Sequence, residues 1–250
     1  TMEQILFLLE KCKFYAEPIY SPSGKLYGVE MLTHFYENSV KLNPQTVLGS
    51  LVYREKKALI KKQLISIISM KHFFVKNKAF CSLNVDAEMA HILISDDSLL
   101  NLLKSIPFLW LEINEMAICN QSRQSFAIQK LSDVCRLMMD DFGTGNTSFS
   151  ALRSEIFSAV IIDKKLLWNT TDKDVLLCLV TRLRMLCPIV IAEGIETLTY
   201  KKEAIRAGVF GLQGWLFPGC YFDNLELSSV AMIHGSKITD RTSNQLRESY

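Results

Sequence analysis

Short apolar runs alternate with longer stretches of helical periodicity along most of this chain. The apolar runs are residues 79–85, 108–114, 135–141, 158–163, 188–194 and 208–214. Most are apolar at consecutive positions, which is typical of strands covered on both faces. Helical patterns cover residues 55–76, 88–105, 122–134, 172–186 and 197–207. This repetition predicts an α/β fold with a parallel sheet, and the number of repeats without a linker favours a single closed barrel over an open doubly wound sheet.

The two ends of the chain depart from this regularity. The stretch FYAEPIYSPSGKLYGVEML, residues 14–32, has Ser-Pro-Ser-Gly between two strand-like runs and is typical of a hairpin. We therefore expect an antiparallel strand near the opening of the barrel. After Phe222 the pattern fades, which predicts one barrel domain over residues 1–222 and a polar C-terminal tail over residues 223–250.

Composition limits the partners and the compartment. The net charge of +2 is too small for a dominant surface for a nucleic acid polymer. Seven scattered cysteines without a Cys-x-x-Cys pair indicate neither a disulfide scaffold nor a structural zinc site, and they fit the reduced cytoplasm. The stretch TMEQILFLLEKCKF lacks a basic leader, and no apolar run is long enough to span a bilayer. We expect a cytoplasmic protein with no membrane partner.

Acids and amides recur where the predicted strands end, and barrels of this kind carry their chemistry at the C-terminal ends of the strands. These residues are Glu30, Asn84, Glu112, Glu115, Asp140, Asp141, Glu193 and Gln213. Neighbouring carboxylates repel one another, so that one of them would take up a proton. Divalent cations with oxygen ligands would remove this repulsion. Two such cations about 3.5–4 Å apart are a common means of attacking a phosphodiester with water.

Other interpretations of these acids remain open at this point. A lone Asp-Asp pair is more often a turn or a helix cap than a metal site. Glycosidases also place two carboxylates at a barrel rim, but they have no need of Asn84, Gln213 and a double aspartate together. An unrelated barrel hydrolase that acts on another phosphate or sugar ester is a further alternative.

Several motifs, in order, resemble the EAL-domain cyclic-di-GMP phosphodiesterases from about Ile19 to Phe217. The motif GVEML resembles the signature Glu-Ala-Leu, with Met31 in place of Ala. The others are LNVD at 83–86, LEINE at 111–115, DDFGTGNTSFSAL at 140–152, IVIAEGIET at 189–197 and LQGWLF at 212–217. The resemblance implies a modified TIM (β/α)8 barrel with one antiparallel strand. It also implies hydrolysis of cyclic-di-GMP to linear 5′-pGpG by two Mg²⁺ or Mn²⁺ ions, with Ca²⁺ inhibitory.

The resemblance also implies roles for individual residues. Glu30, Asn84, Glu112 and Asp140 would bind one metal, and Asp140 would bridge to a second metal beside Asp141 and Glu193. Glu193, Asp141, Glu115 and Gln213 form the implied catalytic group, and Glu196 would support the same rim. The implied substrate-binding residues are Glu17, Met31, Leu32, His34 and Gln213. Glu115 would anchor the loop from Phe142 to Ser150, which in the family couples the site to a dimer interface, so we expect a homodimer.

Three departures from the family pattern leave two functions open. Ile161 stands where the family has a lysine that contacts the nucleophilic water, although Lys164 or Lys165 could substitute for it, and Lys165 shares its strand parity. Glu17 replaces a glutamine near the dianionic ligand. His34 replaces an arginine and could be a packing histidine or a ligand residue. The intact metal set puts a slow phosphodiesterase slightly ahead of a degenerate EAL domain that binds cyclic-di-GMP or a regulatory protein without turnover.

Overall fold

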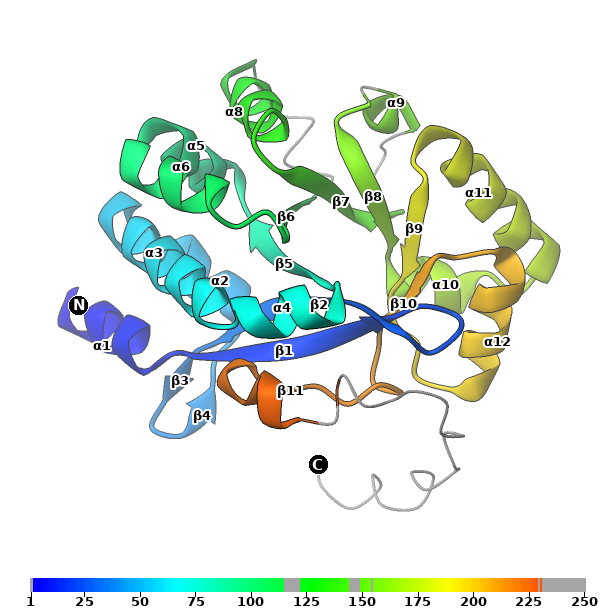
Figure 1. The fold of residues 1–250 in the computed structure, drawn as a ribbon, viewed down its shortest axis with the longest axis horizontal. Helices are drawn as coiled ribbons and strands as arrows, with labels where there is room; N and C mark the ends of the chain where they lie inside the picture. Colours follow the sequence, from blue (N-terminus) through cyan, green and yellow to red (C-terminus); the bar gives the residue numbers. More distant parts are fainter. Residues whose placement is uncertain (1, 115–121, 144–148, 154, 229, 231–250) are drawn as a thin grey trace.

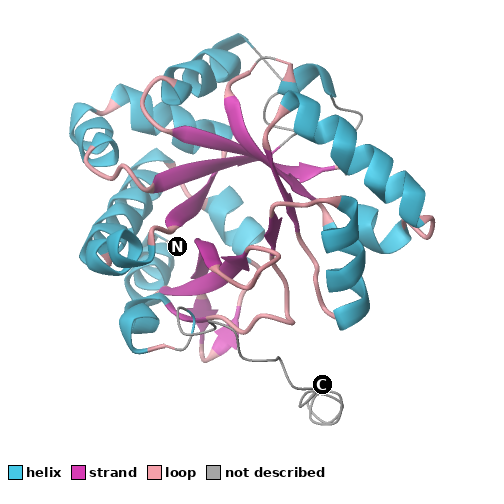
Figure 2. Cartoon of the chain, turned by 45° about the vertical axis from the view of Figure 1, so that its right-hand side comes forward, coloured by secondary structure: helices cyan, strands magenta, loops and turns pink. Residues whose placement is uncertain are grey.

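The computed structural model describes residues 2–114, 122–143, 149–153, 155–228 and 230, and its centre is a barrel of strands ringed by helices (Figures 1 and 2). The barrel strands are β1 (Lys13–Tyr20), β2 (Leu26–His34), β5 (Phe80–Val85), β6 (Leu109–Asn114), β7 (Arg136–Phe142), β8 (Phe157–Ile162), β9 (Ile189–Ala192) and β10 (Gly211–Leu212). They pair in this order, and Tyr20 of β1 pairs with Leu212 of β10 to close the barrel. The predicted closed barrel is confirmed.

Strand β1 is the antiparallel member of the barrel. It runs antiparallel to both β2 and β10, whereas the described pairs from β2 to β10 are parallel. The short strand β11 (Cys220–Tyr221) adds to the outer side of β1, so segments from opposite ends of the chain lie side by side (Figure 1). The predicted hairpin is confirmed, with Gly24 at a φ of 84° in its turn.

Helices cover the outside of the barrel (Figure 2). They are α1 (Met2–Lys11), α2 (Pro44–Ser50), α3 (Tyr53–Ser69), α4 (Lys71–Asn77), α5 (Ala87–Ser95), α6 (Asp97–Lys104), α8 (Ser122–Ser132), α9 (Phe149–Leu152), α10 (Lys164–Asn169), α11 (Lys173–Leu186) and α12 (Leu198–Ala207). A small hairpin of β3 (Tyr36–Glu37) and β4 (Val40–Lys41) follows β2. Within the described chain, no helix is both long and apolar enough to cross a membrane.

Several predicted elements are divided or shortened in the structure. The helical pattern 88–105 divides into α5 and α6 because Asp96 has an extended backbone and its side chain accepts from Leu99 N, so it ends one helix and caps the next. The pattern 55–76 divides at Met70 into α3 and α4. The predicted strand 208–214 is reduced to β10, although Phe210 N still donates to Val190 O and Gln213 N to Ala192 O on either side of it.

The apolar core has two parts. The larger part fills the space between the strands and the helices. The smaller part fills the inside of the barrel and consists of Ile19, Phe80, Trp110, Met138, Ala159, Ile161 and Ile191. Glu112, Asp140 and Glu193 each lie two residues beyond a member of this inner cluster, so strand alternation points them toward the same axis. The inner cluster therefore forms a floor, and the acids lie above it at the C-terminal ends of the strands.

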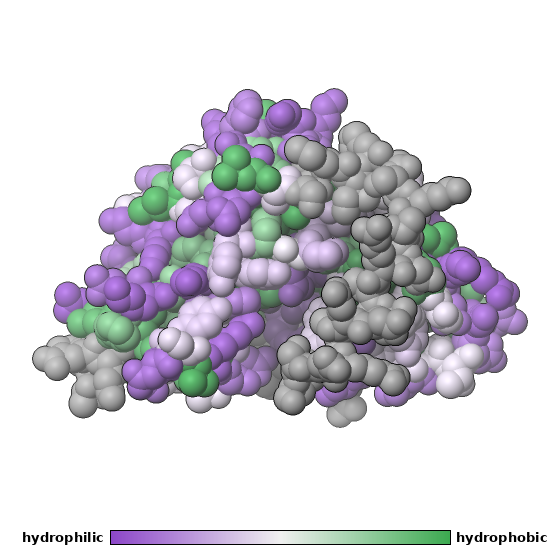
Figure 3. Space-filling model, turned by 90° about the horizontal axis from the view of Figure 1, so that it is seen from below, coloured by the Kyte–Doolittle hydropathy of each residue, from purple (hydrophilic) through white to green (hydrophobic). Residues whose placement is uncertain are grey.

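Packing continues past the expected domain boundary at Phe222. Residues 222–227 form the 3-10 helix η1 (Phe222–Leu227), in which Phe222 and Leu225 are fully buried. The Tyr20 hydroxyl donates to the carbonyl of Val230 at 2.6 Å. The rest of the expected tail lies outside the described residues. Seen from below, the described surface is largely hydrophilic, with hydrophobic residues in small separate groups (Figure 3).

Candidate functional site

A pocket of about 670 Å³ opens at the C-terminal ends of the parallel strands. The predicted site residues that line it are Glu17, Glu30, Met31, Leu32, His34, Asn84, Glu112, Asp140, Asp141, Glu193, Glu196 and Gln213. Among these, Met31 is 1% exposed and also belongs to the main apolar core. Glu115 and residues 144–148 of the predicted coupling loop lie outside the described residues. The structure thus brings together the acids that the sequence places at separate strand ends.

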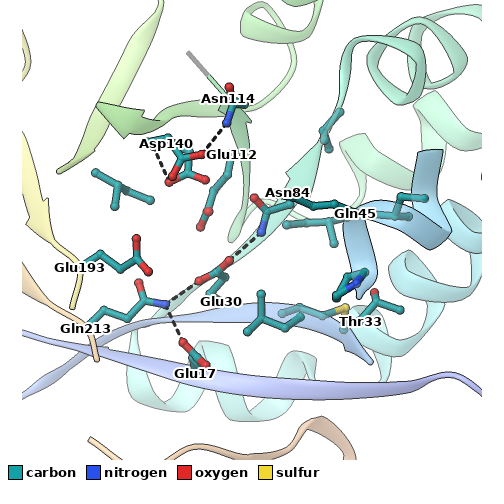
Figure 4. Close-up of a pocket in the computed structure, with 18 of the residues that line it drawn as sticks. Glu17, Glu30, Thr33, Gln45, Asn84, Glu112, Asn114, Asp140, Glu193 and Gln213 are labelled. Carbon is teal, nitrogen blue, oxygen red and sulfur yellow. Dashed lines mark hydrogen bonds between the residues drawn. The ribbon is translucent and has the colours of Figure 1, made fainter. Parts of the chain in front are cut away.

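Glu30 lies at the centre of a hydrogen-bond network that joins β1, β2, β5 and β10 (Figure 4). Asn84 Nδ2 donates to Glu30 Oε1 at 2.6 Å. Gln213 Nε2 donates to Glu30 Oε2 at 2.5 Å and to Glu17 Oε2 at 3.3 Å. Amide N–H groups therefore occupy both oxygens of Glu30, and Glu17 shares the same donor. This network links β1, β2 and β5 to the residue that follows β10.

Glu112 brings a buried carboxylate into the pocket from β6. Its side chain is 1% exposed, and its Oε1 has no hydrogen-bond partner within the described part of the chain. Burial, followed by the negative charges of Glu30 and Asp140, raises its pKa well above the ordinary value for Glu. Because an unpartnered buried oxygen is costly, this atom indicates a place where a cation or an added donor would be stabilised.

Asp140 and Asp141 both face the pocket because the end of β7 is irregular. Consecutive residues of a regular strand point to opposite faces. Asp141, however, has a φ of 57°, and the pairing with β8 shifts register between Met139 and Phe142. Asp141 N donates to Asp140 Oδ1 at 2.8 Å, and Asn114 Nδ2 donates to Asp141 Oδ2 at 2.6 Å. The local bulge thus turns two neighbouring acids to one side.

A third acid, which the sequence analysis missed, completes a compact cluster. Carboxylate oxygens of Asp141, Asp163 and Glu193 all lie within 4.8 Å of one another. Asp163 directly follows β8 and caps α10, accepting from Lys165 N at 2.8 Å. The position of Asp163 after a strand is the same signal that identified the other acids. Asn114, which ends β6, was missed although it too stands at a strand end.

The pKa values of several carboxyl groups of the site are raised toward neutral pH. Burial, followed by the charges of neighbouring acids, raises the pKa of Glu30 to about 8 and that of Asp140 to about 7. Burial also raises the pKa of Glu193 to about 7, although Lys164 opposes this shift. A hard divalent cation prefers oxygen ligands of this kind. The donor set, with the orphaned oxygen of Glu112, therefore fits such a cation chemically.

The hydrocarbon side chain of Ile161 occupies the position where the family resemblance implies a lysine. Ile161 is 2% exposed and packs in the inner cluster of the barrel. Strand β8 ends at Ile162, so the expected strand parity between Ile161 and Lys165 is wrong. Lys164, at the start of α10, lines the pocket instead, with its Nζ 5.9 Å from the centroid of the Trp168 ring.

His34 packs against an aromatic ring and also lines the pocket, while its role toward a ligand stays a prediction. Its ring stacks on Tyr15, with centroids 5.1 Å apart, and it also lines the pocket. Lys41 Nζ lies 3.1 Å from His34 Nε2. Burial, followed by the charge of Lys41, lowers the pKa of His34 to about 4. The ring is thus neutral at physiological pH and lacks the charge that an arginine would offer a phosphate.

Comparison with known proteins places this geometry in a family. The family model for the EAL domain matches residues 4–218. The anti-FlhC(2)FlhD(4) factor YdiV of Salmonella typhimurium LT2 is 25% identical over 80% of this chain and 88% of that protein. YdiV of Escherichia coli K12 is 28% identical over 82% of this chain and 89% of that protein.

Solved structures give the same fold. The crystal structure of the EAL-like domain protein YdiV has a TM-score of 0.77 at 25% identity and covers 86% of this chain and 95% of that chain. The PaMucR phosphodiesterase in complex with c-di-GMP has a TM-score of 0.74 at 23% identity and covers 89% and 99% of the two chains. The matched family model spans nearly the whole barrel, and the pocket lies at the ends of the strands that carry the family motifs. The chain therefore belongs to the EAL domain family.

Proposed function

We propose that this protein is a regulator within the EAL family that acts by binding another protein rather than by hydrolysing cyclic-di-GMP. The observation that carries the proposal is the burial of Ile161 in the apolar interior at the position where the family resemblance implies a lysine. The relatives named as anti-FlhC(2)FlhD(4) factors support it, because their name describes action on a protein complex.

The chemistry of the pocket favours this proposal over turnover. In a phosphodiesterase, the side chain at position 161 would have to donate a hydrogen bond to a water and stabilise developing negative charge. The branched hydrocarbon of Ile161 can do neither. His34 is neutral near pH 7 and cannot provide the bidentate cationic contact that an arginine gives a phosphate. Glu17 adds a carboxyl group to the pocket lining, at the position where the family resemblance implies a glutamine near the dianionic ligand. All three departures thus act against the binding or hydrolysis of cyclic-di-GMP.

Two assays on one preparation test the proposal. Calorimetric titration against the Escherichia coli FlhC(2)FlhD(4) complex is expected to show saturable binding. Incubation with cyclic-di-GMP and Mn²⁺ or Mg²⁺ is expected to yield no pGpG. Absence of binding together with steady formation of pGpG would overturn the proposal. Titration with cyclic-di-GMP in Ca²⁺ would show separately whether the dinucleotide binds without turnover.

Metal-dependent phosphodiesterase activity is the second candidate, and the retained acids favour it. Asp141, Asp163 and Glu193 would hold one Mg²⁺ or Mn²⁺, with Glu112 and Asp140 beside it. A bound divalent cation would lower the pKa of a coordinated water and polarise the phosphoryl group. The expected homodimer remains a prediction, which the molar mass from light scattering would test.

The variant Ile161→Lys separates the two candidates. If position 161 limits catalysis, wild type gives no pGpG and the variant gains activity. Wild-type turnover as fast as that of the variant would favour the phosphodiesterase. Because a buried lysine can destabilise the barrel, Ile161→Met serves as the control for altered packing at the same position.

A further inference from the structure

Acidic groups outnumber basic groups in the lining of the pocket. Eight carboxyl groups line its described wall, against two lysines, Lys41 and Lys164. One of the eight, Asp86, forms an ion pair with Lys56 at 2.9 Å, but the others face the same space. Burial raises the pKa of Glu30, Asp140 and Glu193 toward neutral pH, so these acids are partly protonated without a cation. The acids that are ionised repel an anionic ligand, and an entering cation would favour the ionised form of the others.

One buried carboxyl group of the pocket keeps an oxygen without a hydrogen bond in the described chain, although the Ser82 hydroxyl lies near enough to the group to lower its pKa. Glu112 Oε1 is unpartnered in the described structure, and the side chain is 1% exposed and directed into the pocket (Figure 4). Its neighbour Glu30 shows what satisfies such an oxygen here, because N–H groups of Asn84 and Gln213 occupy both of its oxygens. An entering N–H donor with positive charge would do the same for Glu112.

The mouth of the pocket adds an aromatic surface. Two loops meet there, since Ile195 N donates to Gln213 O and Leu216 N donates to Ile195 O, each at 3.0 Å. These bonds place Glu196 and Trp215 on adjoining loops that both line the pocket. Trp215 is 72% exposed. An indole face and a carboxylate each attract a guanidinium or ammonium group, and this pocket offers both.

We propose that the pocket receives an arginine or lysine side chain of a protein partner, with Glu17, Glu196 and Trp215 at the mouth and Glu112 as an inner acceptor. This inference rests on the proposed protein-binding function. A free amine has the same chemistry. The exposure of Trp215 favours a protein, because a protein surface would bury the indole together with the entering side chain, and aromatic anchors of this kind dominate interface energies.

The first experiment titrates the FlhC(2)FlhD(4) complex into wild type, Glu17→Gln, Trp215→Ala and Glu226→Gln. Glutamine keeps the shape of Glu17 and can still pair with Gln213, so that variant changes mainly the charge. Glu17→Gln and Trp215→Ala are each expected to weaken binding about tenfold. The control Glu226→Gln removes the same formal charge from an exposed position in η1 and is expected to leave binding unchanged. Equal binding by all four proteins would overturn the inference but leave the proposed function intact.

The second experiment uses agmatine, which carries a guanidinium group and an ammonium group, and follows tryptophan fluorescence. Saturable quenching in wild type, weakened in Glu17→Gln and lost in Trp215→Ala, supports a cation site whether or not the complex binds. Competition between agmatine and the complex assigns the site to the partner's side chain. Tight agmatine binding without competition would overturn the protein source in favour of a free amine. Absence of any agmatine effect beyond that of equimolar NaCl would overturn the site itself.

Discussion

Without divalent cations, the protein is expected to lose stability as the pH rises from about 6.5 to about 8. The pKa values of Glu30, Asp140 and Glu193 are raised to about 8, 7 and 7 in the folded state. Groups of this kind contribute stability that is fully present below their unfolded pKa of about 4 and is lost as the pH passes through the folded pKa. The folded chain therefore holds protons in this window that the unfolded chain has released.

Between about pH 6.5 and pH 8, His34 does not oppose the loss of stability caused by the carboxyl groups. The pKa of His34 is lowered to about 4, so the unfolded chain binds an additional proton only below about pH 6.5, and stability from this group rises with pH there. Above that value the carboxylates act alone. One proton held in excess by the folded chain changes the free energy of unfolding by about 1.4 kcal/mol per pH unit. Over about 1.5 units this gives a loss of about 2 kcal/mol, and each further shared proton enlarges it.

Urea denaturation in EDTA at several pH values across the window measures this loss directly. The variant Glu193→Gln removes one titrating group from the cluster and is expected to show a shallower decline. Adding Mg²⁺ or Ca²⁺ is expected to flatten the decline if the carboxylates bind the cation, because the bound ion then favours the ionised forms. A free energy of unfolding that stays constant or increases with pH in EDTA would contradict the expected excess of protons on the folded chain.

Three further predictions follow from particular side chains. Glu112→Gln is expected to raise the free energy of unfolding at about pH 8 by about 1–3 kcal/mol in EDTA, because it removes an acid that must be kept protonated or desolvated, and urea denaturation would show the gain. Ca²⁺ at about a hundred times its Kd is expected to stabilise wild type by about 2.7 kcal/mol, with the effect lost in Asp163→Asn, as thermal unfolding with and without the ion would reveal. Leu225→Ala is expected to cost about 2–4 kcal/mol because Leu225 is fully buried in η1, whereas Leu227→Ala, at an 86% exposed position, should cost almost nothing.

Strand periodicity predicted the barrel and most of the site for one physical reason. Parallel strands deliver their C-terminal residues to one rim, so acids at strand ends converge whatever their distance along the chain. The same reasoning would have identified Asp163 if the end of β8 had been included. It could not predict that both Asp140 and Asp141 face the pocket, because that depends on the positive φ of Asp141, which a propensity argument does not give. Nor could it choose between Lys164 and Lys165, since the choice depends on β8 ending at Ile162.

The three departures from the family pattern change the charge of the site in the same direction, toward fewer cations or more anions. Glu17 adds a carboxyl group, His34 withholds a cation, and Ile161 replaces a cation with hydrocarbon, while the acids of the site remain. Each change is expected to lower affinity for a phosphate, and none of them is expected to impair affinity for a positive charge. If the site had only lost its enzymatic activity, substitutions would also be expected to replace its acidic residues, because a buried carboxylate without a partner costs stability. The retention of these acids beside Ile161 argues that the pocket still binds a cation. The agmatine titration tests for an organic cation, and the Ca²⁺ titration tests for a metal ion.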